Sequence, residues 1–290
     1  MPALWILTDR TYLDQRMPRA VIRWLEEQGC PARVVVADQG AVLTILAPMA
    51  APRELSPWEG LVPGDIVLPR SRHPFALALL KEAEVRGAVA VNPWSAVSKA
   101  RNKVRGTLAL ARRGLPVPPT FLAHRPVDLA TLDRRLFPLL LKPFQGDNAR
   151  GIVLVSDPDQ LEALEWPDVM TLAQPFVDVG GIDLKLYVVD RTVWATRRTS
   201  PLQPEVSPPV AAAVSPELAD LALACGEAFG LRLYGIDVLQ TEGGPIVVDV
   251  NDFPNYTGVP DAVATIGGLL IDEARQTPLP PGPVPAAVPG

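Results

Sequence analysis

Two aspartates and one asparagine have the residue types and the spacing of a magnesium site. Asp237 lies in the apolar run YGIDVLQ, and Asp249 and Asn251 lie in the apolar run PIVVDVN. If Glu242-Gly243-Gly244 is a three-residue loop between antiparallel strands, Asp237 lies opposite Asp249, and Asn251 projects from the same face. Facing carboxylates destabilise a sheet unless a positive group lies between them. Oxygen donors without His or Cys favour Mg²⁺ that takes its remaining ligands from phosphates and water.

Lysine is scarce in this chain, since only five of its 27 basic residues are Lys. Lysine presents a compact ammonium that suits a single phosphate oxygen, whereas arginine presents a planar fork. Lys142 ends the apolar run FPLLLK, and a loop with Gly146 and Gly151 follows before a second apolar run. Glycine lets backbone N–H groups approach anionic oxygens, so this loop is a candidate phosphate cover, with an ordinary hairpin as the alternative.

The first third of the sequence alternates short apolar strands with amphipathic helices, which predicts a parallel sheet. Ligands of such sheets bind beyond the carboxyl ends of the strands. This rule places Thr8-Asp9-Arg10 and Arg70-Ser71-Arg72-His73 at a candidate cleft, although both could be ordinary loops. The segment lacks a glycine-rich dinucleotide fingerprint, which disfavours a nicotinamide cofactor.

Composition narrows the class of protein further. The formal net charge is −5 and the sequence pI is about 5.2, so a nucleic acid is not the expected partner. No apolar run reaches the roughly 18 residues of a membrane helix, and the start MPALWILTDR lacks a basic leader, so we expect a cytoplasmic protein without a membrane partner. The proline-rich stretch 277–290 has little to bury and is expected to be a disordered tail.

These motifs together resemble the ATP-grasp superfamily over roughly Asn92 to Ile271, and they occur in the expected order. The segment SKARNKVRGTLALARRG resembles the nucleotide-binding helix of the superfamily, and QPFV resembles the hinge that holds adenine. The resemblance implies ATP and Mg²⁺ (or Mn²⁺) as cofactors. The positions that match the nucleotide site are Lys103, Lys142, Gly146, Gly151, Gln174, Pro175, Phe176, Val177 and Asp183. The positions that match the metal set are Asp237, Asp249 and Asn251.

The same resemblance implies the architecture. An α/β N-terminal (pre-ATP-grasp) domain over 1–91 is followed by a two-part α+β ATP-grasp unit. Its central subdomain covers 92–174, with one long helix after Asn92, and its C-terminal subdomain covers 175–276.

Within the superfamily the sequence points in two directions. The ribosomal-protein glutamate ligase (RimK-like) group shares the chain length, the helix after Asn92 and the glycine loop. The inositol polyphosphate kinases share LKLYVVDRTVWATRRTSP and DVNDFPNYTGV, with Asp249 where ligases have Glu. Pro175 replaces a common acidic residue of the hinge, but its carbonyl can still accept a hydrogen bond from adenine. The Arg-x-Asn segment of glutamate ligases has no counterpart, and Lys185, Arg197 or Arg198 could supply the missing charge.

The sequence favours a carboxylate–amine ligase that forms an acyl phosphate with ATP. Arg70 and Arg72 would orient the acid, while Lys185 and Arg198 would neutralise charge. The alternatives are a polyol phosphate kinase, which would need Arg10 and His73 as well, and a non-catalytic ATP-binding protein. The expected partners are a small-molecule or peptide carboxylate and an amine acceptor, with a homo-oligomer as a further option.

Overall fold

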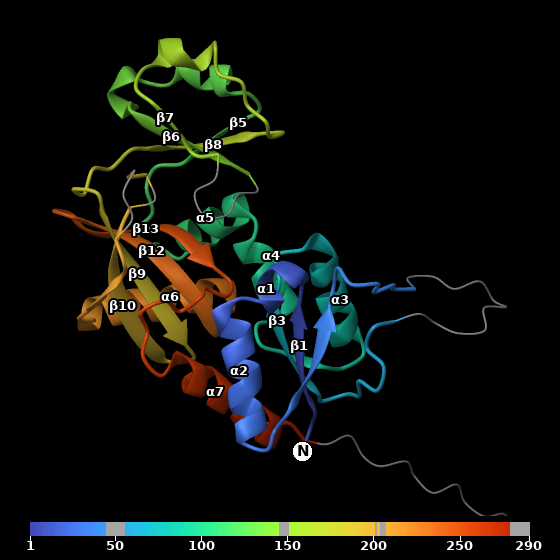
Figure 1. Cartoon of the computed structure of the whole chain (residues 1–290). Helices are drawn as coiled ribbons and strands as arrows, with labels where there is room; N and C mark the ends of the chain where they lie inside the picture. The colour runs from blue at the N-terminus through green and yellow to red at the C-terminus, as the bar shows by residue number, and fades with distance from the viewer. Residues whose placement is uncertain (45–55, 145–150, 201, 204–206, 279–290) are drawn as a thin grey trace, which may run out of the picture. The chain divides into compact units, whose positions relative to one another are not determined.

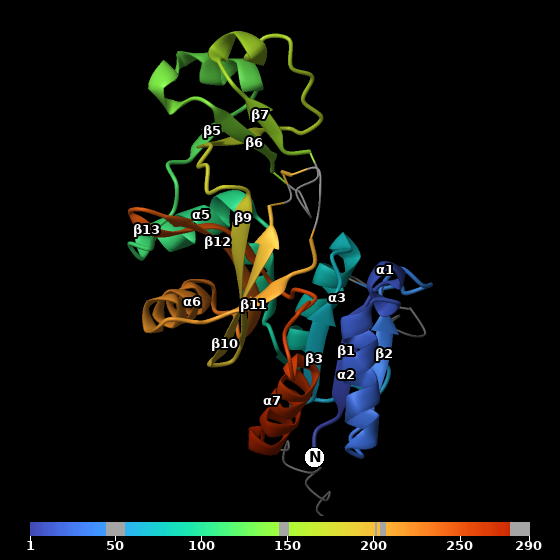
Figure 2. The ribbon, with the colours of Figure 1, turned by 60° about the vertical axis from the view of Figure 1, so that its left-hand side comes forward.

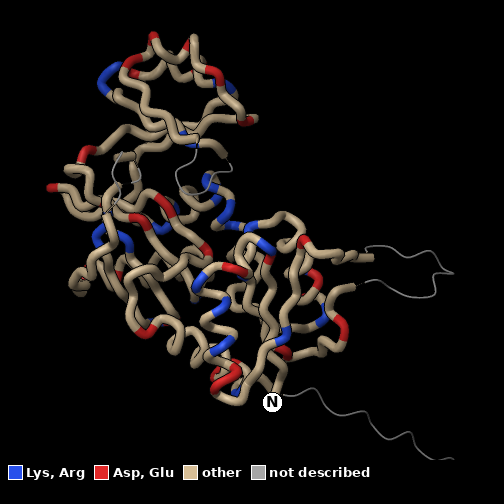
Figure 3. The backbone as a smooth tube through the Cα atoms, viewed as in Figure 1, with Lys and Arg blue, Asp and Glu red and all other residues tan. Residues whose placement is uncertain are grey.

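The computed structural model describes residues 1–44, 56–144, 151–200, 202–203 and 207–278 (Figure 1). The chain forms two compact units, of which the first combines Met1–Trp94 with Asp261–Gly290 and the second is Ser95–Pro260. Most of the stretch that we expect to be a disordered tail, residues 279–290, lies outside the described residues. In both units acidic and basic positions are interspersed along the backbone, so any concentration of positive charge at a site is a local feature (Figure 3).

The first unit contains the predicted parallel sheet, with strand order β2-β1-β3-β4. Every residue of the two central strands is buried, as expected for parallel strands that read as continuous apolar runs. The strands are β1 (Leu4–Thr8), β2 (Ala32–Val36), β3 (Ile66–Arg70) and β4 (Val89–Ala90). The helices are α1 (Arg10–Leu13), α2 (Arg16–Glu27), α3 (Pro74–Val85) and α7 (Ala262–Gln276).

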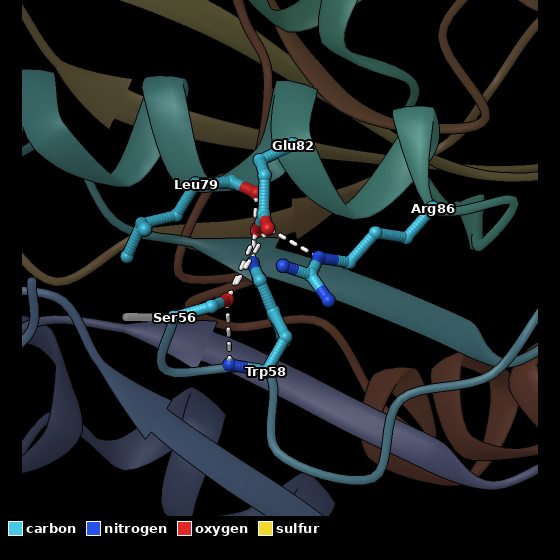
Figure 4. Close-up of polar contacts among 5 residues, drawn as sticks. All are labelled: Ser56, Trp58, Leu79, Glu82 and Arg86. Atoms are coloured by element: carbon cyan, nitrogen blue, oxygen red, sulfur yellow. Dashed lines mark hydrogen bonds and ion pairs between the residues drawn. The ribbon is translucent and has the colours of Figure 1, made fainter. Parts of the chain in front are cut away.

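The segment that leads into β3 is held on helix α3 by side-chain hydrogen bonds (Figure 4). Trp58 is only 2% exposed, and its indole N–H donates to the Leu79 carbonyl at 3.0 Å. The Ser56 hydroxyl donates to a Glu82 carboxylate oxygen at 3.2 Å, and the same carboxylate is paired with Arg86. The long connection from β2 to β3 is therefore attached to the unit before the strand begins.

Helix α7 belongs to the first unit, although the sequence analysis groups residues up to 276 with the C-terminal subdomain. The helix packs along α2 (Figures 1 and 2), and the Trp24 ring of α2 occupies the space beside Gly267, where α7 has no side chain. A Cβ atom built on Gly267 would lie 2.1 Å from Trp24 Cε3. The chain therefore returns to the first unit at its C-terminal helix, which the order of motifs in the sequence does not indicate.

We expect Gly267→Ala to destabilise the protein by about 1–3 kcal/mol, the usual cost of overpacking, because the rigid indole cannot move aside easily. The neighbouring Gly268 is a matched control, since a Cβ atom there meets nothing within 4 Å. Gly268→Ala should stabilise the helix by up to about 1 kcal/mol. Urea unfolding of the two variants measures the difference, and equal stabilities would contradict this account of the α2–α7 contact.

The second unit is built around a five-stranded antiparallel sheet with the order β11-β10-β9-β12-β13. Helix α6 lies on one face of this sheet (Figure 2) and shares its apolar core. The strands are β9 (Ile182–Val189), β10 (Thr192–Thr199), β11 (Val210–Ala212), β12 (Leu233–Thr241) and β13 (Gly244–Asn251). Helix α6 (Pro216–Phe229) has Ser215 as N-cap and Gly230 in a left-handed C-cap.

The long helix expected after Asn92 is two helices, α4 (Trp94–Ala100) and α5 (Lys103–Arg112). Asn102 between them has an extended backbone, and its side chain accepts a hydrogen bond from the Arg105 N–H at 2.9 Å. This cap starts a new helix at Lys103. The prediction of one continuous helix was wrong because the cap residue has no proline or glycine beside it to mark the break.

A second, four-stranded antiparallel sheet has the order β5-β8-β6-β7. Its strands are β5 (Phe121–Ala123), β6 (Leu139–Pro143), β7 (Val153–Val155) and β8 (Thr171–Pro175). One face packs with short 3-10 helices, which are η1 (Pro126–Thr131), η2 (Arg134–Leu136) and η3 (Pro158–Leu161). No helix in the described part of the chain is both long enough and apolar enough to cross a bilayer.

Candidate functional site

Strands β12 and β13 bring the two predicted metal aspartates face to face. Asp237 pairs with Asp249 in the ladder, and Asn251 lies opposite Gly235. The predicted register is confirmed, but it arises differently from the expected three-residue loop. The turn is one residue shorter, because Thr241 pairs with Gly244, and a bulge at Val248 restores the register before Asp249.

Asp237 is held by two cations, Lys185 of the adjacent strand β9 and Arg198 of the next strand, β10. Its Oδ1 atom is 2.7 Å from Lys185 Nζ and 2.8 Å from Arg198 Nη2. Lys185 is directly opposite Asp237 in the β9–β12 ladder, and it is 5% exposed. A Cβ atom on Gly235 would lie 3.0 Å from Lys185 Cε, so glycine leaves room for the lysine side chain to reach the carboxylate.

Asp249 is held by a cation from the start of helix α5. Lys103 Nζ donates to its Oδ1 atom at 3.2 Å. Partial withdrawal from water acts to raise the pKa of the Asp249 carboxyl, but Lys103, Lys142 and Lys185 together outweigh this effect and lower the pKa below its usual value. Asp249 is therefore ionised at neutral pH, and three lysines provide the positive field around it.

Lys142 is a buried cation at the end of β6. It is 8% exposed, and its Nζ donates to the side-chain oxygen of Gln174 on β8 at 2.6 Å. Gln174 in turn donates to the Thr120 hydroxyl at 3.0 Å. Burial lowers the pKa of Lys142 to about 8, an effect that the nearby Asp249 carboxylate partly opposes. A small change in local charge therefore alters the protonation of this lysine near physiological pH.

A cavity within the second unit lies beside Lys103, Lys142 and Asp249. Side chains of both of its sheets and of helix α5 contribute to its wall. The lining residues include Lys103, Thr107, Lys142, Leu172, Gln174 and Asp249. The cavity combines two lysines and one carboxylate with apolar walls, which suits a ligand with an anionic part and a flat apolar part.

Other predicted nucleotide residues lie around the same strands. Asp183 is paired with Arg198 in the β9–β10 ladder, and burial raises the pKa of its carboxyl above the usual value. Pro175 ends β8, and the Phe176 N–H donates to the Pro138 carbonyl at 2.8 Å, while Val177 follows it. Gly151 has a positive φ of 75° beside Pro143, whereas Gly146 lies outside the described residues.

Arg70 and Arg72 belong to the first unit, and the structure does not relate them to the charges of the second unit. Arg70 lies at the carboxyl end of β3, as the alternation of strands and helices in the sequence predicts. The residue is 5% exposed. Its guanidinium lies 4.3 Å from the Tyr12 ring centre, and Nη2 donates to Gln15 Oε1 at 3.1 Å. Their role toward an acid stays a prediction.

The sequence analysis misses two features of this site. The side chain of Gln174 accepts a hydrogen bond from Lys142, whereas the sequence motif predicts only a hinge for adenine at this residue. Arg101 and Asp252 form an ion pair beside the predicted phosphate and metal residues, with 3.1 Å between Nη2 and Oδ2. Their positions next to Asn102 and Asn251 are the only sequence signal for that pair.

The donor set fits a divalent hard cation. Asp237, Asp249 and Asn251 offer oxygen atoms alone, and two carboxylates face each other across paired strands. No cluster of three His, Cys, Asp or Glu side chains with the geometry of a metal site occurs in the ranges that the structure describes. Two carboxylates and one amide leave coordination positions for phosphates and water, which is typical of Mg²⁺.

Comparison with known sequences gives consistent relatives. The RimK-like ATP-grasp domain family matches residues 100–271. A probable alpha-L-glutamate ligase of Alkalilimnicola ehrlichii is 27% identical over 269 residues, covering 82% of this chain and 89% of the relative. A probable alpha-L-glutamate ligase of Alcanivorax borkumensis is 29% identical over 225 residues, covering 71% of this chain and 74% of the relative.

Solved structures give the same fold. The ATP-grasp ligase PsnB, complexed with a minimal precursor, Mg and ADP, superposes with a TM-score of 0.71 at 17% identity. That match covers 94% of this chain and 98% of PsnB. A RimK domain ATP-grasp protein from Sphaerobacter thermophilus has a TM-score of 0.69 at 20% identity, with coverage of 93% and 98%. The predicted ATP-grasp fold is confirmed at this level.

Proposed function

The chain belongs to the RimK-like ATP-grasp family, and from this premise we propose that it is an ATP-dependent ligase that joins a carboxylate to an amine through an acyl phosphate. The observation that carries the proposal is the facing pair Asp237 and Asp249, surrounded by lysines beside a cavity. A charged constellation of this kind is suited to holding a polyphosphate and its cation. The names of the relatives support an amino acid as one substrate.

The lysines of the second unit would hold the phosphates of ATP. Lys103 and Lys142 line the cavity, and each already contacts an oxygen atom that a phosphate oxygen could replace. Phosphoryl transfer needs little covalent help from a protein, because positioning and neutralisation of charge provide most of the catalysis. The predicted hinge, Gln174 to Val177, would offer backbone groups to adenine.

Asp237, Asp249 and Asn251 would hold Mg²⁺ or Mn²⁺. When bound, the cation would neutralise part of the charge of the phosphates. Lys185 and Arg198, which pair with Asp237, would stabilise charge that develops on the transferred group. Arg70 and Arg72 are the proposed anchors for the acid, since guanidinium groups match carboxylates.

The proposed reaction has two steps, phosphorylation of the acid and attack by the amine. A carboxylate oxygen attacks the γ-phosphorus of ATP, ADP leaves, and an acyl phosphate forms. The amine then attacks the acyl carbon, the carbon–oxygen bond to phosphate breaks, and the amine loses a proton to solvent. The products are an amide, ADP and inorganic phosphate. The acid would be a small-molecule or peptide carboxylate, since precursor peptides are present in the complexes of several structural neighbours.

A substrate panel with hydroxylamine tests the proposal, because this small amine captures acyl phosphates as hydroxamates. We expect ADP release and a hydroxamate with at least one amino acid, dicarboxylate or peptide, identified by mass. Inositol phosphates are the comparison substrates. A product heavier by one phosphoryl group, formed without any amine, would instead identify a kinase and contradict the ligase.

A further inference from the structure

Two ion pairs join the same two segments of the second unit. Lys103 at the start of α5 is paired with Asp249, with 3.2 Å between Nζ and Oδ1. Arg101, two residues earlier, is paired with Asp252, three residues later than Asp249. Both Arg101 Nε and Nη2 donate to Asp252 Oδ2, at 3.3 and 3.1 Å. The second pair therefore repeats the connection that the first pair makes beside the cavity.

The Arg101–Asp252 pair is much less exposed than an ordinary surface ion pair. Its side chains are 16% and 7% exposed, whereas those of Arg232 and Asp190, in the same unit, are 40% and 46% exposed. Two charges that are buried in this way must be well matched, because removal of one partner leaves the other charge buried without compensation. The pair is thus a firm connection between the segments.

Both segments are places where regular structure stops. Arg101 lies between α4 and α5, directly before the cap residue Asn102. Asp252 directly follows β13 and its last residue, Asn251. The Arg101 N–H still donates to the Val97 carbonyl at 3.1 Å, so the last turn of α4 fixes the backbone there, and the ion pair adds a side-chain contact that joins this end of the helix to the end of the strand.

The loop after β13 is fixed from a second direction by aromatic rings. The Tyr256 ring lies 5.5 Å from the Tyr187 ring and 6.0 Å from the Phe253 ring. The Tyr256 hydroxyl donates to the Val188 carbonyl at 2.8 Å, and the tyrosine is 3% exposed. One end of the Arg101–Asp252 pair is therefore attached to a rigid support, which lets it hold the other end in place.

We propose that Arg101 and Asp252 are positioning residues of the nucleotide site, which set the place of Lys103 relative to Asp249 and Asn251. This inference rests on the proposed function. Neither residue is part of the cavity wall, while both Lys103 and Asp249 are. When phosphates bind, Lys103 must share its contacts between Asp249 and the ligand. The Arg101–Asp252 pair lies outside that wall and would keep the two segments in register.

The experiment measures the dissociation constant of the ATP analogue AMPPNP with Mg²⁺ by calorimetry. Asp252→Asn removes the charge at nearly constant shape, and Arg101→Lys keeps the charge but loses the fork. We expect Asp252→Asn to weaken binding about tenfold, the lower end for loss of a group that orients a ligand-binding residue. Arg101→Lys should lie between wild type and Asp252→Asn. Circular dichroism verifies that each variant is folded, and Arg101→Lys serves as the test if Asp252→Asn does not fold.

The control is Asp190→Asn, because Asp190 accepts from Arg232 Nε at 2.9 Å in the same unit and undergoes the same chemical change. Its affinity should equal that of wild type. A double-mutant cycle with Lys103→Met then separates positioning from a general loss of stability. If Asp252 acts through Lys103, Asp252→Asn should change the affinity of the Lys103→Met protein less than twofold.

Two results would overturn the positioning role while leaving the proposed function in place. One is wild-type affinity in both Asp252→Asn and Arg101→Lys. The other is a full tenfold loss of affinity when Asp252→Asn is added to the Lys103→Met protein. Failure of the wild-type protein to bind AMPPNP would overturn the proposed function itself, together with this inference. The two failures are therefore distinguishable within one set of titrations.

Discussion

Replacing Asp249 with Asn should reduce ligase turnover by at least about 100-fold, the scale on which loss of one charge-stabilising group slows reactions of this kind. Asp249 is the carboxylate that faces Asp237 across the β12–β13 ladder and that pairs with Lys103. The amide has nearly the same shape but no charge, so it offers a weaker metal ligand. Nucleotide binding without metal should change much less than turnover. Release of ADP in the presence of Mg²⁺ measures turnover, and calorimetry measures binding.

Asp159→Asn is the matched control for this prediction. Asp159 lies in the same unit and pairs with Arg134, but its side chain is 81% exposed. We expect wild-type turnover from it, since exposed pairs contribute little. Binding of Mn²⁺ with nucleotide, followed by electron paramagnetic resonance, provides a readout other than activity. Turnover and Mn²⁺ binding of Asp249→Asn within a few-fold of wild type would remove Asp249 from the metal site.

The second large effect concerns pH and Lys142. Burial lowers the pKa of this lysine to about 8 in the protein alone, and bound phosphates would raise it again. Below pH 8 the lysine carries its charge before and after binding, so affinity is highest there. Above pH 8 binding must take up a proton, so affinity should fall by up to about tenfold per pH unit until the pKa of the complex is reached.

Titrations of AMPPNP from about pH 7.5 to 9.5 test this prediction, and the Lys142→Met protein reports any part of the pH dependence that comes from ionisation of the nucleotide itself. Lys142→Met should bind about 10–100-fold more weakly at pH 7.5, the cost of a charged hydrogen bond, and its affinity should vary less with pH. Lys142→Arg should also lose the pH dependence, because arginine stays protonated, yet it should not fully restore affinity. An identical pH profile for wild type and Lys142→Met would assign the titration to another group.

The strand register of the site is predictable from the sequence because alternation constrains it. Asp237 alternates along β12 with the buried core residues Ile236 and Val238, so a slip by one residue would turn it toward that core. The burial pattern therefore determines which residues pair more strongly than the length of the turn does. The structure has a shorter turn and a bulge at Val248, and the two deviations cancel before Asp249. Local turn chemistry is less predictable because either combination gives the same facing pair.

The parts that sequence reasoning misses depend on contacts between distant segments. The apolar pattern of α7 shows that the helix has a face to bury but does not identify its partner, which is Trp24 on α2. Similarly, Lys142 and Gln174 are 32 residues apart, and Arg101 and Asp252 are 151 apart. Each of these polar partners is an ordinary residue in its local sequence. Only the folded chain brings them together.

The central claim, ligation through an acyl phosphate, is tested most directly by isotope transfer from the acid. The measurement uses a carboxylate substrate from the hydroxylamine panel, labelled with ¹⁸O in its carboxyl group, together with ATP, Mg²⁺ and an amine. If the carboxylate attacks the γ-phosphorus, one labelled oxygen must leave with the phosphate, and mass spectrometry should find one ¹⁸O in each inorganic phosphate per amide formed. Amide formation with unlabelled phosphate, or a phosphorylated product without free phosphate, would contradict the account.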